Sequence, residues 1–324
     1  MSRVLVIGGT AFIGPALVER LLERGDQVVV LHRRRGTRFG DRVSEIQCDR
    51  NDPAGVRSAL AGQSFDVVYD NVYDWQRGTT AEQVVASVQA AGPGLRRYVF
   101  TSSVAVYPPG LDHDEEDALV PAERPEPYAR HKAETERALF RVHREQGIGV
   151  TTLRPAFIYG PENPFERESF FWDRILSGRS IVIPGDGARP MQFVLASDVA
   201  RAAVMAAERQ EAIGQAFNLG CVPPLTQVEF VRALAGAAGR EARLVHVPRE
   251  RIQAAGGQLL EAPLYFGAYL DLPPKTVRME RAVSVLGFAP TPLTAGLEAT
   301  FAWYGRQARP RPDFSWEDRL LAGI

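Results

Sequence analysis

A glycine-rich turn between an apolar run and a helical pattern is the feature that most constrains how this chain can fold. Residues 3–7 read Arg-Val-Leu-Val-Ile, glycines follow at positions 8, 9 and 14, and apolar residues recur at helical spacing up to Leu22. A strand, a tight turn and a helix in this order bring backbone N–H groups and the positive end of the helix close to a pyrophosphate. The pattern predicts a dinucleotide cradle made of Gly8, Thr10, Ala11, Phe12, Ile13 and Gly14.

One position departs from the Gly-x-x-Gly-x-x-Gly spacing, because Ala11 replaces the middle glycine. A methyl group there is a small intrusion toward the phosphates, so we expect an altered cofactor fit and not a lost site. We expect Gly14 to remove a side chain where helix and strand touch. A glycine-rich turn that holds no nucleotide is the alternative interpretation.

Strand-like and helical segments alternate along the first two thirds of the chain. Strands are predicted at 3–7, 27–31, 44–48, 65–69, 97–100 and 150–153, and 216–219 reads as a further strand that returns to the same sheet. This alternation predicts an α/β fold, a doubly wound parallel sheet with helices on both faces. We expect one domain at 1–160 and about 191–220, and a smaller substrate-binding lobe at about 161–190 and 221–324.

Composition excludes several classes of protein. The formal net charge of −1 gives no general attraction to nucleic acid or to an anionic membrane, and no apolar run is long enough to cross a bilayer. Because the first predicted strand begins at Arg3, we expect no signal peptide before it. The two cysteines, Cys48 and Cys221, are far apart and lack metal-ligand spacing. We therefore expect a soluble cytoplasmic protein with no metal, no nucleic-acid partner and no membrane contact.

The residues after the second strand bear on the choice of cofactor. NAD-selective sites place an acidic residue here to accept hydrogen bonds from the adenosine ribose, whereas this chain has His32, Arg33, Arg34 and Arg35. Because the planar fork of arginine suits a 2′-phosphate, the run favours NADP(H), with NAD(H) as the weaker candidate. A solvated basic loop is the alternative. We expect the rest of the cofactor to be bound by Asp49, Asp70, Asn71, Ser102, Lys132 and Pro155.

Tyr128 and Lys132 stand one helical turn apart in a stretch predicted to be a long helix from Tyr128 to Gln146. The chain contains only two lysines, so the occurrence of one at this spacing is informative. A phenol is too weak an acid to exchange a proton readily near neutrality, and an adjacent ammonium lowers its pKa. The hydroxyl of Ser103 follows the fifth strand and can hold the reacting oxygen. These three residues are our candidate catalytic set, and an ordinary pair on a surface helix is the alternative.

These segments together resemble the extended short-chain dehydrogenases/reductases of the NAD-dependent epimerase/dehydratase family. The resemblance rests on the glycine turn, Ser102-Ser103-Val-Ala-Val-Tyr107, Tyr128-x-x-x-Lys132 and Arg154-Pro-Ala-Phe-Ile-Tyr-Gly-Pro161. It implies a Rossmann domain, a bound NAD(H) or NADP(H), Tyr128 as general acid and base, Lys132 holding the nicotinamide ribose, and Ser103 binding the substrate oxygen. It also implies a homodimer.

Departures from the family narrow the chemistry. Val104 and Ala105 stand where dehydratases of the family carry an Asp-Glu pair, which disfavours dehydration. Phe157 and Met191 replace the Asn and Arg that usually hold the pyrophosphate of a sugar nucleotide, and Arg189 could substitute. We expect the substrate, a secondary alcohol or ketone of sugar-like or small carbonyl type, to contact Ser103, Phe157, Phe171 and Arg189. The segment around Phe171 also resembles chloroplast stem-loop RNA-binding relatives, so a Rossmann protein that binds dinucleotide or RNA with little turnover is the second hypothesis.

Overall fold

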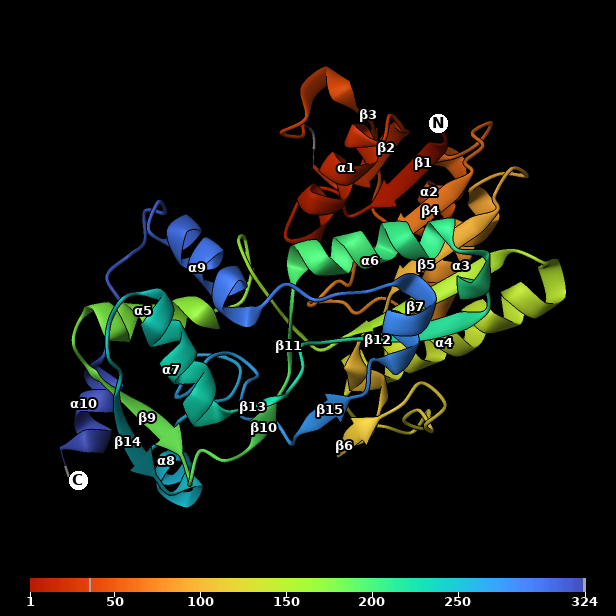
Figure 1. Ribbon diagram of the computed structural model, residues 1–324. Coiled ribbons are helices and arrows are strands. Elements are labelled where there is room, and N and C mark those ends of the chain that lie inside the picture. Colours follow the sequence, from red (N-terminus) through yellow and green to blue (C-terminus); the bar gives the residue numbers. More distant parts are fainter. Residues whose placement is uncertain (35, 323–324) are drawn as a thin grey trace.

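A seven-stranded parallel sheet organises the larger part of the molecule (Figure 1). The computed structural model describes residues 1–34 and 36–322. The strands lie in the order β12-β7-β5-β4-β1-β2-β3, which is the doubly wound order of a Rossmann fold. Their bounds are β1 Arg3–Ile7, β2 Gln27–His32, β3 Ser44–Gln47, β4 Val67–Asp70, β5 Arg97–Thr101, β7 Gly149–Pro155 and β12 Gln215–Leu219. The expected α/β fold is confirmed, including the return of the last strand to pair with β7.

Alternate residues of the inner strands face two separate hydrophobic cores. Val4 and Val6 pack under α1 (Ile13–Glu23) and α6 (Ala196–Glu208), while Leu5 and Ile7 face the opposite side. That opposite side is covered by α2 (Pro53–Ala59), α3 (Ala81–Ala90) and α4 (Pro127–Gln146). Near-continuous apolar strands are required because a parallel sheet is buried on both faces.

A further core lies beside the carboxyl ends of the strands, in the part of the chain at the left of Figure 1. Its helices are α5 Glu168–Leu176, α7 Gln227–Ala237, α8 Arg249–Ala254, α9 Leu293–Tyr304 and α10 Ser315–Leu321. Paired short strands complete it: β9 Ser180–Pro184 with β14 Arg243–Val247, β8 Phe157–Tyr159 with β11 Phe193–Leu195, and β10 Pro190–Met191 with β13 Leu225–Thr226.

One excursion of the C-terminal part differs from the expected boundaries. Strand β15 (Lys275–Val277) pairs with β6 (Gly110–His113), and Met279 and Phe288 then pack into the core under α6. The π-helical turn η4 (Ala282–Leu286) lies between them. The sequence analysis groups residues 275–288 with the smaller lobe, but they pack beside the central sheet. Their apolar side chains complete the hydrophobic core that α1 and α6 form.

The acidic stretch at the end of β6 and just after it contains buried residues. His113 is buried, with its ring stacked on Tyr107 at a centroid distance of 4.7 Å and its Nδ1 2.6 Å from Asp117 Oδ2. Glu115 is buried as well and accepts a hydrogen bond from the backbone N–H of Asn218 at 2.9 Å. Long-range packing therefore covers part of this acidic stretch.

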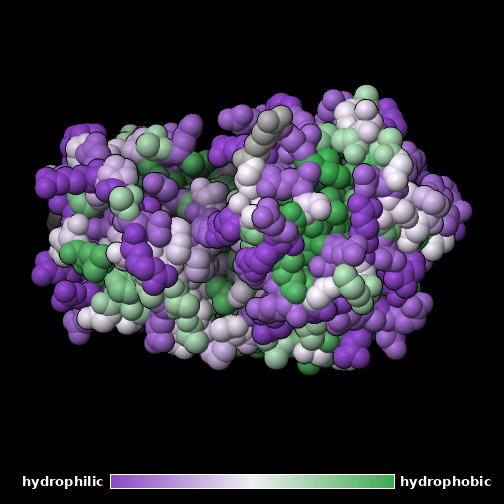
Figure 2. Space-filling model, turned by 90° about the horizontal axis from the view of Figure 1, so that it is seen from above, coloured by the Kyte–Doolittle hydropathy of each residue, from purple (hydrophilic) through white to green (hydrophobic). Residues whose placement is uncertain are grey.

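Most of the face seen from above in Figure 2 is hydrophilic, with hydrophobic residues gathered in one area on the side of the central sheet. Among the described residues, no helix combines the length and the hydropathy that crossing a membrane requires.

Candidate functional site

The glycine turn between β1 and α1 has a shape that only glycine permits at two positions. Gly8 has φ of +90°, a conformation that L side chains rarely adopt. A Cβ on Gly14 would lie 2.1 Å from the carbonyl oxygen of Gly8, so helix and turn touch through bare backbone. Thr10 and Phe12 are partly buried, Ala11 is exposed, and Ile13 anchors the helix in the core. Binding of a pyrophosphate by the backbone N–H groups of this turn stays a prediction.

Phe12 holds a backbone conformation that is unusual for a residue with a side chain. Its φ is 55° and its ψ is −104°, at the residue that caps the N-terminus of α1. Strained backbone of this kind concentrates at ligand-binding turns, because the surrounding structure must enforce it. It marks the same turn that the glycines define.

Lys132 lies at the carboxyl end of β5, sealed from water. Its side chain is on α4, only 4% of the residue is exposed, and Nζ donates a hydrogen bond to the carbonyl oxygen of Thr101 at 2.6 Å. Among the described residues no carboxylate lies within 4.0 Å of this nitrogen. Burial therefore lowers the pKa of Lys132 to about 8, although more distant Asp70 and Glu136 oppose the shift.

Tyr128 and Ser103 meet beside this lysine. Nζ of Lys132 lies 6.0 Å from the centre of the Tyr128 ring, on the same face of α4. Burial raises the pKa of the Tyr128 phenol, while a hydrogen bond with Ser103 and the charge of Arg167 act to lower it. Ser103 caps the short turn η2 (Val104–Val106), accepting from the N–H of Ala105 at 3.1 Å. The three residues predicted to act together are thus brought together by the fold.

Aromatic side chains surround the phenol, and sequence reasoning missed most of them. Trp75 stacks on Tyr128 at 4.6 Å, and Tyr73 meets it edge-on at 4.7 Å. Phe165 and Tyr269 in turn contact Trp75, with centroid distances of 5.0 and 5.9 Å. Tyr73 and Trp75 follow Asp70 and Asn71 closely in the sequence, but the other two rings come from loops far away in the sequence. We call these four rings the aromatic cluster.

Two buried polar atoms at the ends of β4 and β5 have no partner among the described residues. They are Asn71 Nδ2 and Ser102 Oγ. Asn71 uses its carbonyl oxygen to accept from the Thr101 hydroxyl at 2.5 Å, so only its donor is left over. An unpaired buried donor is costly, and a bound polar ligand would satisfy it. Both atoms lie where the parallel strands end and where a dinucleotide binds in this fold. Pro155, also predicted along the cofactor, is the buried last residue of β7.

Asp70 and His32 do not offer their side chains to a ligand, which corrects two sequence predictions. The carboxylate of Asp70 is fully buried and accepts from Arg50 and from the Tyr98 hydroxyl, the latter at 2.7 Å. His32 is buried with its Nε2 3.0 Å from Glu45 on β3. Both side chains face neighbouring elements because sequence position at a strand end does not decide which face of the sheet a residue takes.

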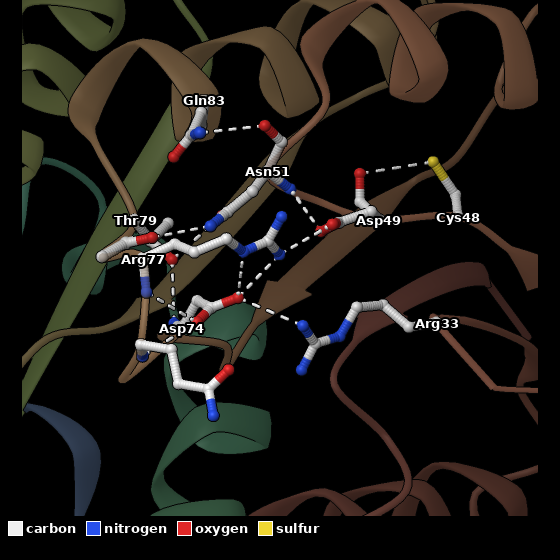
Figure 3. Close-up of polar contacts among 10 residues, drawn as sticks. Arg33, Cys48, Asp49, Asn51, Asp74, Arg77, Thr79 and Gln83 are labelled. Carbon is white, nitrogen blue, oxygen red and sulfur yellow. Dashed lines mark hydrogen bonds and ion pairs between the residues drawn. The ribbon is translucent and has the colours of Figure 1, made fainter.

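An ion network occupies the end of the sheet where an adenosine would lie (Figure 3). Asp74 Oδ2 is 3.1 Å from Arg33 Nη1 and 2.7 Å from Arg77 Nη2, and that same Arg77 nitrogen is 2.7 Å from Asp49. Asn51, Thr79 and Gln83 continue the network through hydrogen bonds to each other and to the backbone. Arg33 and Arg34 are exposed. Arg35, the third arginine of the run, lies outside the described residues.

Three of the residues predicted to contact substrate differ in how exposed and how engaged their side chains are. Phe157 is partly exposed, and the guanidinium of Arg167 lies 5.2 Å from its ring centre. Phe171 is fully buried in the core of the smaller lobe, against Phe266 at 4.9 Å, so the expectation of a substrate contact is corrected. Arg189 forms an ion pair with Asp271 at 2.9 Å, so its charge is already neutralised within the smaller lobe.

Comparison with known proteins agrees with this geometry. The sequence model of the NAD dependent epimerase/dehydratase family matches residues 4–220. The chain is 30% identical to the chloroplast stem-loop binding protein of 41 kDa b of Arabidopsis thaliana, covering 99% of this chain and 84% of the relative. It is 31% identical to a UDP-glucose 4-epimerase of Mycolicibacterium smegmatis, covering 73% of this chain and 83% of that protein.

Solved structures show the same architecture. The UDP-glucose 4-epimerase of Thermotoga maritima, solved with UDP-glucose, superposes with a TM-score of 0.77 at 22% identity, covering 94% of this chain and 99% of that one. MoeE5 in complex with UDP-glucuronic acid and NAD gives a TM-score of 0.74 at 26% identity, with coverage of 94% and 99%. The family match spans two thirds of the sequence and includes the glycine turn, Ser103, Tyr128 and Lys132. The chain belongs to the NAD dependent epimerase/dehydratase family.

Proposed function

We propose that this protein is an NAD(P)-dependent oxidoreductase or epimerase that moves a hydride at a secondary alcohol or ketone. The observation that carries the proposal is the convergence of Tyr128, Ser103 and buried Lys132 beside the glycine turn. Relatives named as epimerases and reductases support the class of reaction. With no acid-base pair at Val104 and Ala105, dehydration is disfavoured.

The residues present fit a dinucleotide. The bare backbone at Gly8 and Gly14 would hold the pyrophosphate, and the unpaired donors of Asn71 and Ser102 would meet polar groups nearer the nicotinamide. The nicotinamide supplies or accepts the hydride when the cofactor is bound. We propose NADP(H) as the preferred form, because no carboxylate is free at the end of β2 while Arg33 and Arg34 are exposed there.

The chain's own side chains move the proton. Tyr128 would take the proton of a substrate hydroxyl during oxidation and return it during reduction. The ammonium of Lys132 lies close to the Tyr128 ring on the same helix face, so its positive charge favours the phenolate. Because Lys132 is buried, few water molecules screen this attraction. Ser103 donates a hydrogen bond to the substrate oxygen and holds it near the phenol. If the oxidised substrate rotates in the site and presents its other face before it is reduced, the same residues give epimerisation.

Sugar-like compounds are the substrates we favour. Solved neighbours bind UDP-glucose and UDP-glucuronic acid, the latter together with NAD. However, Met191 is buried, and Phe157 has no polar group to offer a pyrophosphate. The expected pairing of two chains stays a prediction, which the mass of the protein in solution would test.

Tyr128→Phe tests the proposal. Small molecules that co-purify with the protein are first identified by mass spectrometry, and hydride exchange between the labelled cofactor and that compound is then measured. We expect Tyr128→Phe to lower exchange by roughly 10²–10⁴-fold, as loss of a general acid-base does, while cofactor binding is retained. Tyr304→Phe is the matched control, since Tyr304 bonds to Asp173 in the smaller lobe. Unchanged exchange in Tyr128→Phe would exclude the proposed mechanism.

RNA binding is the second candidate, favoured by one observation. The relative that covers 99% of this chain is named for stem-loop binding. The net charge of −1 argues against it, because nonspecific RNA affinity depends on released counterions. Fluorescence anisotropy with a stem-loop RNA at physiological salt separates the candidates. Submicromolar binding that Tyr128→Phe leaves intact would support the RNA function.

A further inference from the structure

Arg167 is a buried arginine in the wall of the site, and sequence reasoning did not single it out. It directly precedes α5, and only 8% of it is exposed. Its Nε donates to the carbonyl oxygen of Ala268 at 3.2 Å and its Nη1 to that of Ile158 at 2.9 Å. The guanidinium lies 4.9 Å from the centre of the Phe165 ring, a member of the aromatic cluster. These contacts fix its position and orientation.

Within residues 1–34 and 36–322 the charge of Arg167 has no carboxylate partner, unlike that of the other buried arginines. Three such arginines each form an ion pair: Arg50 with Asp70, Arg154 with Glu136 and Arg174 with Glu317. For Arg167, no described carboxylate oxygen lies within 4.0 Å. A buried guanidinium without a counter-ion is costly, and buried charges are ordinarily paired. The exception needs a physical reason.

The neighbouring acid does not supply the missing charge. Glu168 is buried, and both of its carboxylate oxygens accept from Asn163 Nδ2, at 3.2 and 3.0 Å. Burial raises the pKa of Glu168 to about 7, so this carboxyl is only partly ionised near neutral pH. Glu168 acts on Arg167 only from beyond ion-pair distance. At neutral pH the guanidinium thus keeps most of its positive charge uncompensated.

The guanidinium of Arg167 keeps one nitrogen without a described partner, and it lies beside the aromatic cluster. Nη2 makes no hydrogen bond to the described residues, yet it is not sealed from solvent. The guanidinium packs on the ring of Phe165, Phe165 contacts Trp75, and Trp75 stacks on Tyr128. The positive charge of Arg167 also acts to lower the pKa of the Tyr128 phenol. One donor and the positive charge of Arg167 are therefore left available in the aromatic surroundings of Tyr128.

We propose that Arg167 is the subsite for an anionic group, a carboxylate or a phosphate, that the substrate carries close to its reacting carbon. The inference rests on the proposed function only in placing substrate at Tyr128. A bound anion would neutralise the guanidinium and accept from Nη2 in a desolvated setting, where such hydrogen bonds are strong. The aromatic cluster would then cover the apolar face of the substrate.

Small anions test this subsite without knowledge of the substrate. Acetate and inorganic phosphate are titrated against NADP⁺-loaded protein by ligand-observed NMR, with acetamide as the neutral match for acetate. We expect either anion to bind at least about tenfold more tightly than acetamide, and Arg167→Gln to remove that preference. Whether acetate or phosphate binds more tightly identifies a carboxylate or a phosphate as the natural group.

Two further variants keep the test decisive. Arg167→Lys retains a charge but loses the fork, so we expect intermediate affinity for the anions. Arg179→Gln is the matched control, since Arg179 pairs with Asp318 at the surface and should leave binding unchanged. Anion binding that equals acetamide binding in the unmodified protein, or that survives in Arg167→Gln, overturns the proposal. Because this readout needs no turnover, it fails or succeeds separately from the Tyr128→Phe experiment.

Discussion

The two ends of the cofactor cleft handle positive charge in opposite ways. At the catalytic end, Lys132 and Arg167 are buried and have no described carboxylate within ion-pair distance. At the adenosine end, Arg33 and Arg77 are exposed and share Asp74, and Arg77 also reaches Asp49. Both ends are linked by the loop between β4 and α3, because it carries Asp74 and, one residue later, Trp75 of the aromatic cluster.

Under the proposed function, the difference separates groups that act on the reacting atoms from groups that recognise the cofactor. A buried charge without a partner acts strongly on a nearby reacting atom, since the local dielectric is low. An exposed, already paired charge can exchange one anion for another at little cost and is weakened by salt. Substitutions at the catalytic end should therefore have large effects that salt does not change, and those at the adenosine end smaller effects that it does.

The largest effect is expected from Lys132→Met. Removing the ammonium takes away the field that favours the Tyr128 phenolate, so we expect hydride exchange to fall by roughly 10²–10⁴-fold at any salt concentration. Replacing an unpaired buried charge with an apolar group of similar size is often neutral for stability. The midpoint of thermal unfolding should thus shift by only a few degrees, roughly the change that 1 kcal/mol produces. A large drop in stability would show that Lys132 is mainly structural.

A pH profile sharpens the contrast through the same lysine. Burial lowers the pKa of Lys132 to about 8, so the ammonium is lost as the pH rises through that value. We expect kcat/KM to decline above about pH 8, by up to about tenfold per pH unit. For stability the sign is opposite. In the unfolded chain Lys132 has its ordinary pKa of about 10.4. The contribution of this lysine to the free energy of unfolding is therefore complete above about pH 10.4, and it is lost as the pH falls through about 8. Lys132→Arg should lack the decline in kcat/KM, since guanidinium stays protonated.

The smallest effects are expected at the adenosine end, and two substitutions there should act in opposite directions. Arg33→Gln should weaken NADP⁺ binding by about tenfold and leave NAD⁺ binding unchanged, because only the 2′-phosphate loses a partner. Asp74→Asn should strengthen NADP⁺ binding, because it removes the carboxylate that Arg33 now contacts. Calorimetric titrations at low and high salt measure both, and the differences should shrink as salt screens them. Equal NAD⁺ and NADP⁺ affinities in the unmodified protein would contradict the assigned preference.

Local sequence was sufficient for the parts of the site that lie on continuous segments. Gly8 and Gly14 belong to one turn, and Tyr128 and Lys132 to one helix, so spacing alone places them relative to each other. The parallel sheet with helices on both faces followed from the alternation of strands and helices, whereas the order of the strands came from the structure. Even the sparing use of lysine pointed to Lys132.

What the sequence by itself determined is therefore the Rossmann architecture, the glycine turn and the placing of Tyr128 and Lys132 on one helix face, because each is encoded by periodicity or by a few neighbouring positions. Only the tertiary structure decided which side chains keep an unsatisfied charge. Asp70, His32 and Arg189 looked available but are paired with Arg50, Glu45 and Asp271, whereas Arg167 is left without an anion. Pairing depends on residues brought together from distant segments, and burial sets the cost of leaving a charge alone, so neither can be read from a local pattern.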